Sequence, residues 1–168
     1  MRKVKLVLFQ LIAMFFIVSA VRKIWFATYS DELECLLKFT KDNEVDCWDE
    51  SKYGNISIFM NDIQFFTLYV SLAFVFAILI LNMALRFSWK TTITVFVGSV
   101  FLVRIIQTDL ANLVLNSFGG IFFENRLYKY IIESLTYAII GIVFLMLSVK
   151  IGKEGQKIDR DRKIKKLV

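Results

Sequence analysis

Side chains that could carry chemistry gather in one otherwise apolar stretch, "FLVRIIQTDLANLVLNSFGG", residues 101–120. It holds Arg104, Gln107, Asp109 and Asn112. A guanidinium, two amides and a carboxylate can pair with a neighbouring helix or line an ion path. When such groups lie inside a membrane they are expensive to bury, and this makes them candidates for function.

The same residue types do not form a catalytic constellation. The chain has no histidine, which excludes histidine general bases and His-ligated zinc or haem. Its two cysteines form no CxxC pair, the equipment that thiol oxidoreductases need. The acids available for a lipid-acting enzyme are Asp109, Glu124 and Glu133. We therefore expect a protein that is not an enzyme and that binds no cofactor or metal.

The composition predicts that these groups sit in a membrane protein. The chain of 168 residues is 57% hydrophobic, with a mean hydropathy of +0.60, seventeen phenylalanines and no proline. Soluble domains are closer to about 45–50% apolar. Long apolar runs recur, and they predict an all-α integral membrane protein with four transmembrane helices in a bundle. The predicted spans are about 6–27, 63–85, 91–115 and 131–149.

These spans would form a single domain, residues 1–168, with an outer loop at 28–62 and a cytoplasmic basic tail at 150–168. The first run resembles a signal peptide in its basic start, but its apolar centre is long and no A-x-A site follows. We therefore favour a retained span.

The distribution of charge predicts the direction of the spans. With the N-terminus inside, thirteen of the 21 basic residues and three of the 15 acidic ones lie on the inner side. This positive-inside bias predicts cytoplasmic termini and a multi-pass protein of the plasma membrane, here a bacterial inner membrane. Because loop topology accounts for the net charge of +6, no nucleic-acid partner is expected. The basic tail is expected to contact anionic lipids, with a partner-binding tail as the alternative.

The predicted outer loop carries both cysteines. Cys35 and Cys47 would meet an oxidising compartment, so a disulfide is expected, with two unpaired thiols as the alternative. In the chain-entropy model such a cross-link stabilises by roughly 3 kcal/mol. Capping-box-like spacing at Asp31 and Glu34 predicts a short helix in the loop. The loop is acidic, which suits a cationic partner or a merely solvated segment. Asn55 begins a glycosylation sequon.

The charge within the third span has two interpretations. A helix from Thr91 places Arg104 roughly 20 Å along, in the outer third of a core about 30 Å thick. There it could snorkel to the headgroups. Alternatively, Glu133 lies at a similar depth in the fourth span, about 24 Å from the inner edge, and would form an interhelical ion pair with Arg104.

The layout of loops and spans resembles immunity proteins that protect bacteria against pore-forming colicins of the A and B type. Within residues 99–149 an apolar span gives way to "QTDLANLVLNSFGGIFF" and then to the aromatic-rich "YKYIIESLTYAIIGIVFLML". The resemblance implies a non-enzymatic inner-membrane protein that blocks a toxin's pore-forming domain before it opens. It assigns no individual binding residue.

A second resemblance concerns topology alone. Claudin-like four-span proteins also place two cysteines in a first outer loop, but their upstream tryptophan motif is missing here, where Trp25 lies at a span end. Two functional classes follow from the whole sequence. The favoured one is a protein whose partners are the lipid bilayer and another membrane-inserted protein or toxin domain. The alternative is a small transport, channel or assembly subunit of a larger membrane complex.

Overall fold

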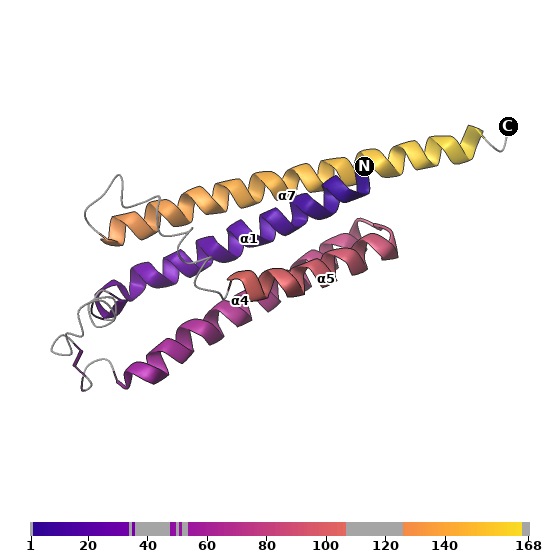
Figure 1. Ribbon diagram of the computed structural model, residues 1–168. Helices are drawn as coiled ribbons and strands as arrows, with labels where there is room; N and C mark the ends of the chain where they lie inside the picture. The colour runs from indigo at the N-terminus through magenta and orange to yellow at the C-terminus, as the bar shows by residue number, and fades with distance from the viewer. Residues whose placement is uncertain are drawn as a thin grey trace.

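Four long helices make up the fold. The computed structural model describes residues 2–33, 35, 48–49, 51, 54–106 and 126–165. The helices are α1 (Arg2–Thr28), α4 (Ile56–Ala84), α5 (Trp89–Ile106) and α7 (Arg126–Lys165) (Figure 1). Each is long and apolar enough to cross a membrane, and no strand occurs within the described ranges. The all-α class and the number of membrane-length helices are therefore as predicted.

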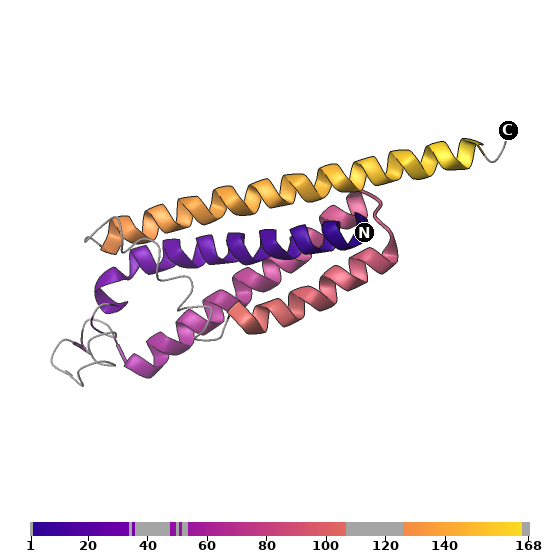
Figure 2. The same cartoon turned by 45° about the horizontal axis from the view of Figure 1, so that its top comes forward.

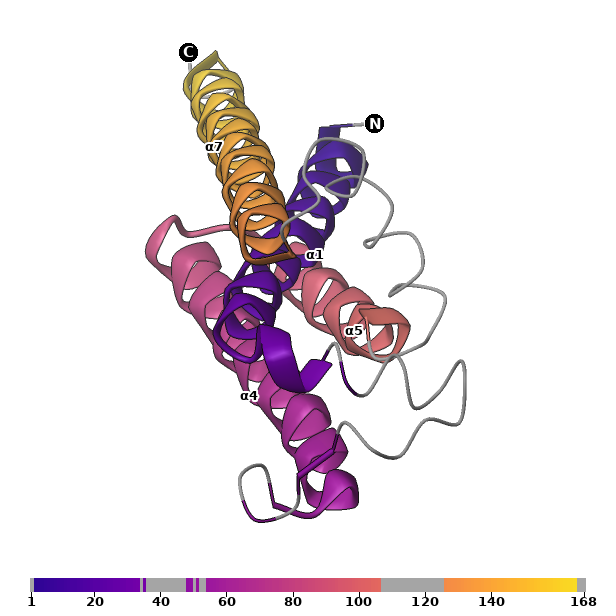
Figure 3. The ribbon, with the colours of Figure 1, turned by 90° about the vertical axis from the view of Figure 1, so that its left-hand side faces the viewer.

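Helix α1 is the centre of the bundle. It packs along α7 and against both α4 and α5, and α4 packs against α5 (Figures 1 and 2). The view along the bundle in Figure 3 shows α1 between α7 on one side and the α4–α5 pair on the other.

The helices alternate in direction. The start of α1, the turn between α4 and α5 and the C-terminal end of α7 all lie at one end of the molecule (Figure 1). We name this the basic end, after its exposed Lys3, Lys5, Arg86, Lys90 and Lys153. The opposite end, where Thr28, Ile56 and Arg126 lie, is named the loop end.

Local sequence explains where α4 begins and ends. Asn55 caps the helix, its side chain accepting a hydrogen bond of 2.9 Å from the backbone N–H of Ser57. The helix thus starts seven residues before the predicted span. At its other end Arg86 adopts a φ of 52°, the left-handed conformation that commonly closes a helix. Ser88 and Thr91 share a hydrogen bond of 2.7 Å at the start of α5.

The other predicted boundaries differ from the helices in instructive ways. The 40 residues of α7 correspond to roughly 60 Å, about twice the thickness of a bilayer core. The helix therefore continues from the predicted span 131–149 through most of the basic tail. Helix α5 is described to Ile106, and the rest of the predicted span 91–115 lies outside the described residues. Of the short helix predicted after Asp31, residues 31–33 and Cys35 are helical.

Three helices share the main apolar core. Met14 and Val18 of α1 meet Val75 and Ile78 of α4, together with Val95, Val103 and Ile106 of α5. The contact between α1 and α7 is of another kind, because small residues let the two backbones approach closely. A Cβ added at Gly141 would lie 2.5 Å from Ile17 Cγ1 and 3.2 Å from the Ala13 carbonyl oxygen. Such small-residue contacts are typical of helix pairs in membranes, where packing and hydrogen bonds replace the hydrophobic effect.

Candidate functional site

A buried ion pair joins the two most closely packed helices. Lys23 Nζ of α1 lies 2.5 Å from Glu133 Oε2 of α7, and the two side chains are 2% and 0% exposed. Charges removed from solvent in this way need a close partner, because their desolvation is costly. Polar contacts between helices also fix rotation and register, which apolar faces alone specify weakly. This pair is therefore the strongest candidate for a specific site within the bundle.

The predicted pairing of Glu133 with Arg104 is wrong. Glu133 meets Lys23, whereas Arg104 is exposed on α5. The physical reason is the position of α1, which lies between α7 and α5 and so receives the carboxylate first (Figure 3). The depth of Glu133 identified the level at which a cation had to lie, but not the helix that supplies it.

Aromatic rings surround the buried cations. Lys23 Nζ lies 5.3 Å from the ring centroid of Tyr130, and the Arg22 guanidinium carbon lies 4.9 Å from that of Phe26. The rings of Phe26 and Tyr130 meet edge to face at 5.8 Å. Rings within about 6 Å attract a cation through their negative faces, and more strongly where water is excluded. These aromatics therefore stabilise the positive charges of α1 alongside Glu133.

Arg22 and Lys23 connect α1 to different helices. Successive residues of a helix point about 100° apart, because one turn holds 3.6 residues. While Lys23 reaches α7, Arg22 Nη1 donates a hydrogen bond of 3.2 Å to the backbone carbonyl of Ile106, at the end of α5. Ser134 of α7 adds a second link between α1 and α7, because its hydroxyl donates a hydrogen bond of 2.8 Å to the Ala20 carbonyl of α1.

A second buried polar contact joins α1 to α4. Gln10 Nε2 donates to Asn82 Oδ1 at 2.6 Å, and Asn82 Nδ2 donates to Gln10 Oε1 at 3.1 Å. Both side chains are fully buried. Because each amide satisfies the other, the pair avoids the cost of an unpaired polar group and links the helices by a reciprocal hydrogen bond.

Aromatic residues at the loop end pack on one another. The ring of Trp25 lies 5.8 Å from that of Phe59 and 5.6 Å from that of Phe66, joining α1 to α4. Trp48 lies 5.5 Å from Phe59 and donates a hydrogen bond of 2.9 Å to the Gly54 carbonyl. Aromatic residues near the ends of spans, such as Trp25 and Phe66, commonly anchor a helix at the membrane interface. The structure gives these residues an additional role, since their cluster holds Trp48 against the bundle.

The remaining predicted residues divide into described and undescribed ones. Gln107, Asp109 and Asn112 lie outside the described residues, as does Cys47. Cys35 is buried, with 5% of its surface exposed. The sequence did not single out Lys23, Arg22 or the Gln10–Asn82 pair. Their one signal was that each interrupts a long apolar run with a polar group.

The cross-link between Cys35 and Cys47 stays a prediction. Such a cross-link would join Cys35, in the helical residues after α1, to the residue directly before Trp48. Mass spectrometry of the non-reduced protein should show peptides joined through Cys35 and Cys47. A Cys47→Ser variant should unfold more readily, by about 3 kcal/mol, under the same conditions. Alkylation of both thiols in the native protein would refute the cross-link.

The buried polar residues described above hold the helices together. Lys23 and Glu133 are paired and buried, so neither is presented to a substrate. Within the part of the chain that the structure describes, no group of three or more potential ligands could hold a metal ion. A comparison of the chain with family models, curated proteins and solved structures finds no match.

Proposed function

We propose that this chain is an integral membrane protein, with both termini cytoplasmic, that recognises another membrane-inserted protein through the face of α5 around Arg104. The partner class that we favour is a pore-forming toxin domain, as in the immunity proteins that the sequence resembles. The observation that carries the proposal is that Arg104 is exposed on the apolar helix α5. In contrast, Lys23 of α1 and Glu133 of α7 are paired inside the bundle.

The arrangement of charge supports this membrane orientation. Most of the exposed basic residues that the structure describes lie at the basic end, among them Lys3, Lys5, Arg86, Lys90 and Lys153. The chain enters and leaves the bundle at this end (Figure 1). Since cytoplasmic flanks carry the excess of lysine and arginine, the basic end is assigned to the cytoplasm.

Cysteine labelling tests the orientation. Single cysteines replacing Lys157 and Ser51, in a chain whose natural cysteines are serine, should behave oppositely in intact cells. A membrane-impermeant maleimide should modify position 51 and should reach position 157 only after the membrane is opened. Labelling of position 157 in intact cells would overturn the assignment.

Arg104 lies where a charge is costly. It is fifteen residues beyond Trp89, the first residue of α5, which corresponds to roughly 22 Å along the helix. Its neighbours Val100, Phe101 and Ile105 are 52%, 68% and 51% exposed, so this face is apolar and open. A guanidinium among lipid-facing side chains is stabilised either by snorkelling or by an anionic partner. A carboxylate on another inserted helix supplies that partner.

Such a contact gives specificity as well as affinity. Truncating one side of a desolvated charge pair commonly costs about 2–5 kcal/mol, because the other charge is left unpaired. An inserted helix with a carboxylate at matching depth would be retained on this face, whereas a purely apolar helix would not. A protein that holds a toxin helix in this way keeps it from completing a pore.

The experiment compares three variants in cells challenged with pore-forming toxin domains of the A and B colicin class. The parent chain should protect, and Arg104→Leu should lose protection by at least about tenfold, corresponding to 1.4 kcal/mol. Arg104→Lys keeps the charge and the ability to snorkel but loses the planar fork, so we expect intermediate protection. Lys90→Leu, on the same helix at the basic end, is the control and should protect fully.

The outcomes separate the favoured class from the alternative. A photo-crosslinker at Phe101 should capture the toxin domain in challenged cells. If the parent chain protects against no toxin and the crosslinker captures a resident membrane protein, the chain is an assembly subunit of a larger complex. If it captures lipid alone, and Arg104→Leu changes nothing, the face around Arg104 is not a docking surface.

A further inference from the structure

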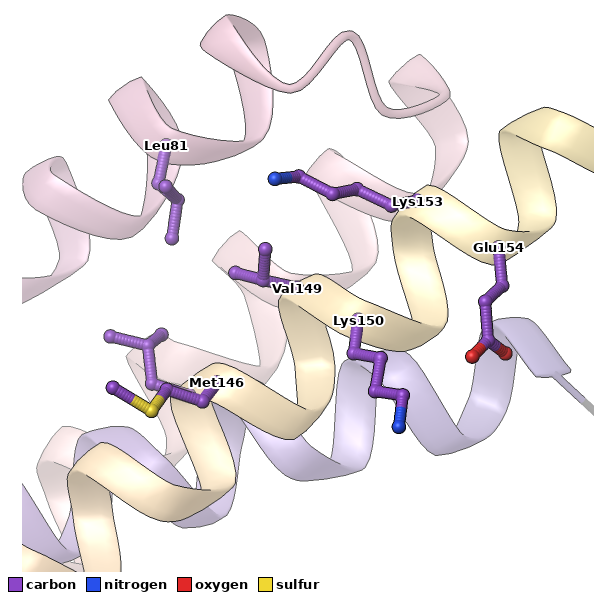
Figure 4. A pocket seen from close by; sticks show the side chains of 7 residues that line it. Leu81, Met146, Val149, Lys150, Lys153 and Glu154 are labelled. Carbon is purple, nitrogen blue, oxygen red and sulfur yellow. The ribbon is translucent and has the colours of Figure 1, made fainter.

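An apolar groove lies between α4 and α7 at the basic end. Leu81 of α4 faces Met146 and Val149 of α7 across a cavity of about 470 Å³, which Leu145 also lines (Figure 4). This volume falls within the range of about 300–1,000 Å³ that is usual for small-molecule sites. The groove is therefore large enough to hold part of a lipid.

One end of the groove is basic. Lys150, Lys153 and Glu154 complete its lining. In Figure 4 Lys153 extends toward the side on which Leu81 lies, whereas the charged ends of Lys150 and Glu154 point away from it. Within the described ranges Lys153 forms no ion pair, and it is exposed. A cation is thus available beside an apolar slot.

The turn between α4 and α5 holds α7 in place beside the groove. The buried Gly152 accepts the ring of Phe87, since a Cβ added there would lie 2.1 Å from Phe87 Cζ. Phe87 follows α4 by three residues, so this contact ties α7 to the end of α4 just beyond Val149. The groove is therefore formed by two helices that the fold fixes at the basic end.

The order of residues along α7 matches the order of groups in a phospholipid. Val149 is the last residue of the predicted span, and Lys153 follows one turn later, about 6 Å along the helix. Apolar walls at acyl-chain depth therefore give way to a cation at headgroup depth.

We propose that the groove binds one acyl chain of an anionic phospholipid from the cytoplasmic leaflet, with Lys153 contacting its phosphate and headgroup. The inference rests on the proposed membrane placement of the chain. Charge complementarity selects the ligand, because the cytoplasmic surface of a membrane is negative and attracts lysines near it. The apolar lining provides the rest, since Leu81, Met146 and Val149 favour an acyl chain over a polar headgroup.

The test is native mass spectrometry of the full chain in mild detergent with added phosphatidylglycerol or phosphatidylcholine. The parent chain should retain one phosphatidylglycerol. Lys153→Gln should weaken phosphatidylglycerol binding about fivefold, the equivalent of one surface lysine, and should leave phosphatidylcholine binding unchanged. Val149→Trp should fill the slot and abolish retention of both lipids.

Two matched controls distinguish binding in the groove from the general effects of losing a positive charge or adding a large side chain. Lys157→Gln removes an exposed lysine farther along α7, and Val143→Trp adds the same bulk on an exposed part of α7. Both should retain phosphatidylglycerol like the parent chain. Equal weakening by Lys153→Gln and Lys157→Gln would overturn the proposal, because lipid would then be held by overall charge.

Other results identify a different occupant or a failure elsewhere. A lipid-free dimer that Val149→Trp separates would assign the groove to a second copy of the chain and overturn the lipid site. If the chain fractionates with membranes but retains no phosphatidylglycerol, the groove proposal alone fails. If it does not fractionate with membranes at all, the membrane placement itself is wrong.

Discussion

Replacing Glu133 with alanine is expected to destabilise the bundle by about 3–5 kcal/mol, because it leaves the ammonium of Lys23 buried without its carboxylate. Lys23 and Glu133 are 2% and 0% exposed, so water cannot replace the lost partner without opening the contact between α1 and α7. Lys23→Met should cost a similar amount for the converse reason. Equilibrium unfolding in detergent, or trapping of the unfolded chain in bilayers, measures both effects.

The double variant Lys23→Met/Glu133→Met decides whether the pair acts as a unit. Removing both charges eliminates both desolvation costs, so the double variant should be more stable than either single variant. Glu154→Ala, at an exposed carboxylate on the same helix, serves as control and should change stability by about 1 kcal/mol or less. If the two single effects simply add, the side chains do not interact and the ion pair does not hold α1 to α7.

The sequence predicted the depth of the ion pair in the bilayer, but not which residues form it. Counting residues along helices gives a depth, and the depth of Glu133 was sufficient to expect an interhelical partner. The rotation of each helix about its axis, and the helices that it contacts, depend on which helix occupies the centre of the bundle. Hydropathy does not determine that. The sequence does not mark Lys23 as buried, because a basic residue before Trp25 is typical of a span end at the headgroups.

The Gln10–Asn82 contact shows the same limit. Each amide interrupts an apolar run, and this signal is visible in the sequence. Pairing them requires the offset between α1 and α4 along the bundle. That offset depends on the length of the polar segment between them and on side-chain packing, which are tertiary properties.

The position of each helix was predictable from its apolar run, whereas the residues at which α4 begins and α7 ends were not. The apolar runs located all four helices, because a run of about 20 apolar residues has few alternatives to a helix. In the sequence Asn55 indicates only a sequon, yet in the structure its side chain caps α4 by accepting a hydrogen bond from the Ser57 N–H. The continuation of α7 into the charged tail was not predicted, since a hydropathy window ends where the lysines begin.

The second large effect is expected at Gly141. A side chain there has no space, because its Cβ would lie 2.5 Å from Ile17 Cγ1 and 3.1 Å from the backbone nitrogen of Ile17. The Ile17 side chain can rotate, but the backbone of α1 can move only if the helices separate. Gly141→Leu should therefore destabilise by about 1–3 kcal/mol or more, the usual cost of overpacking.

Two further variants show whether the cost arises from the contact with α1. Ala77→Leu adds similar bulk at an exposed position of α4 and should be nearly neutral in the same unfolding measurement. Ile17→Ala removes the nearest side-chain atoms, so it should partly rescue Gly141→Leu while destabilising the parent chain by leaving a cavity. The rescue should stay incomplete, because the Ala13 carbonyl oxygen remains 3.2 Å from the added Cβ. Full stability of Gly141→Leu alone would mean that α1 and α7 do not approach closely here, and the alignment of Lys23 with Glu133 would then need another cause.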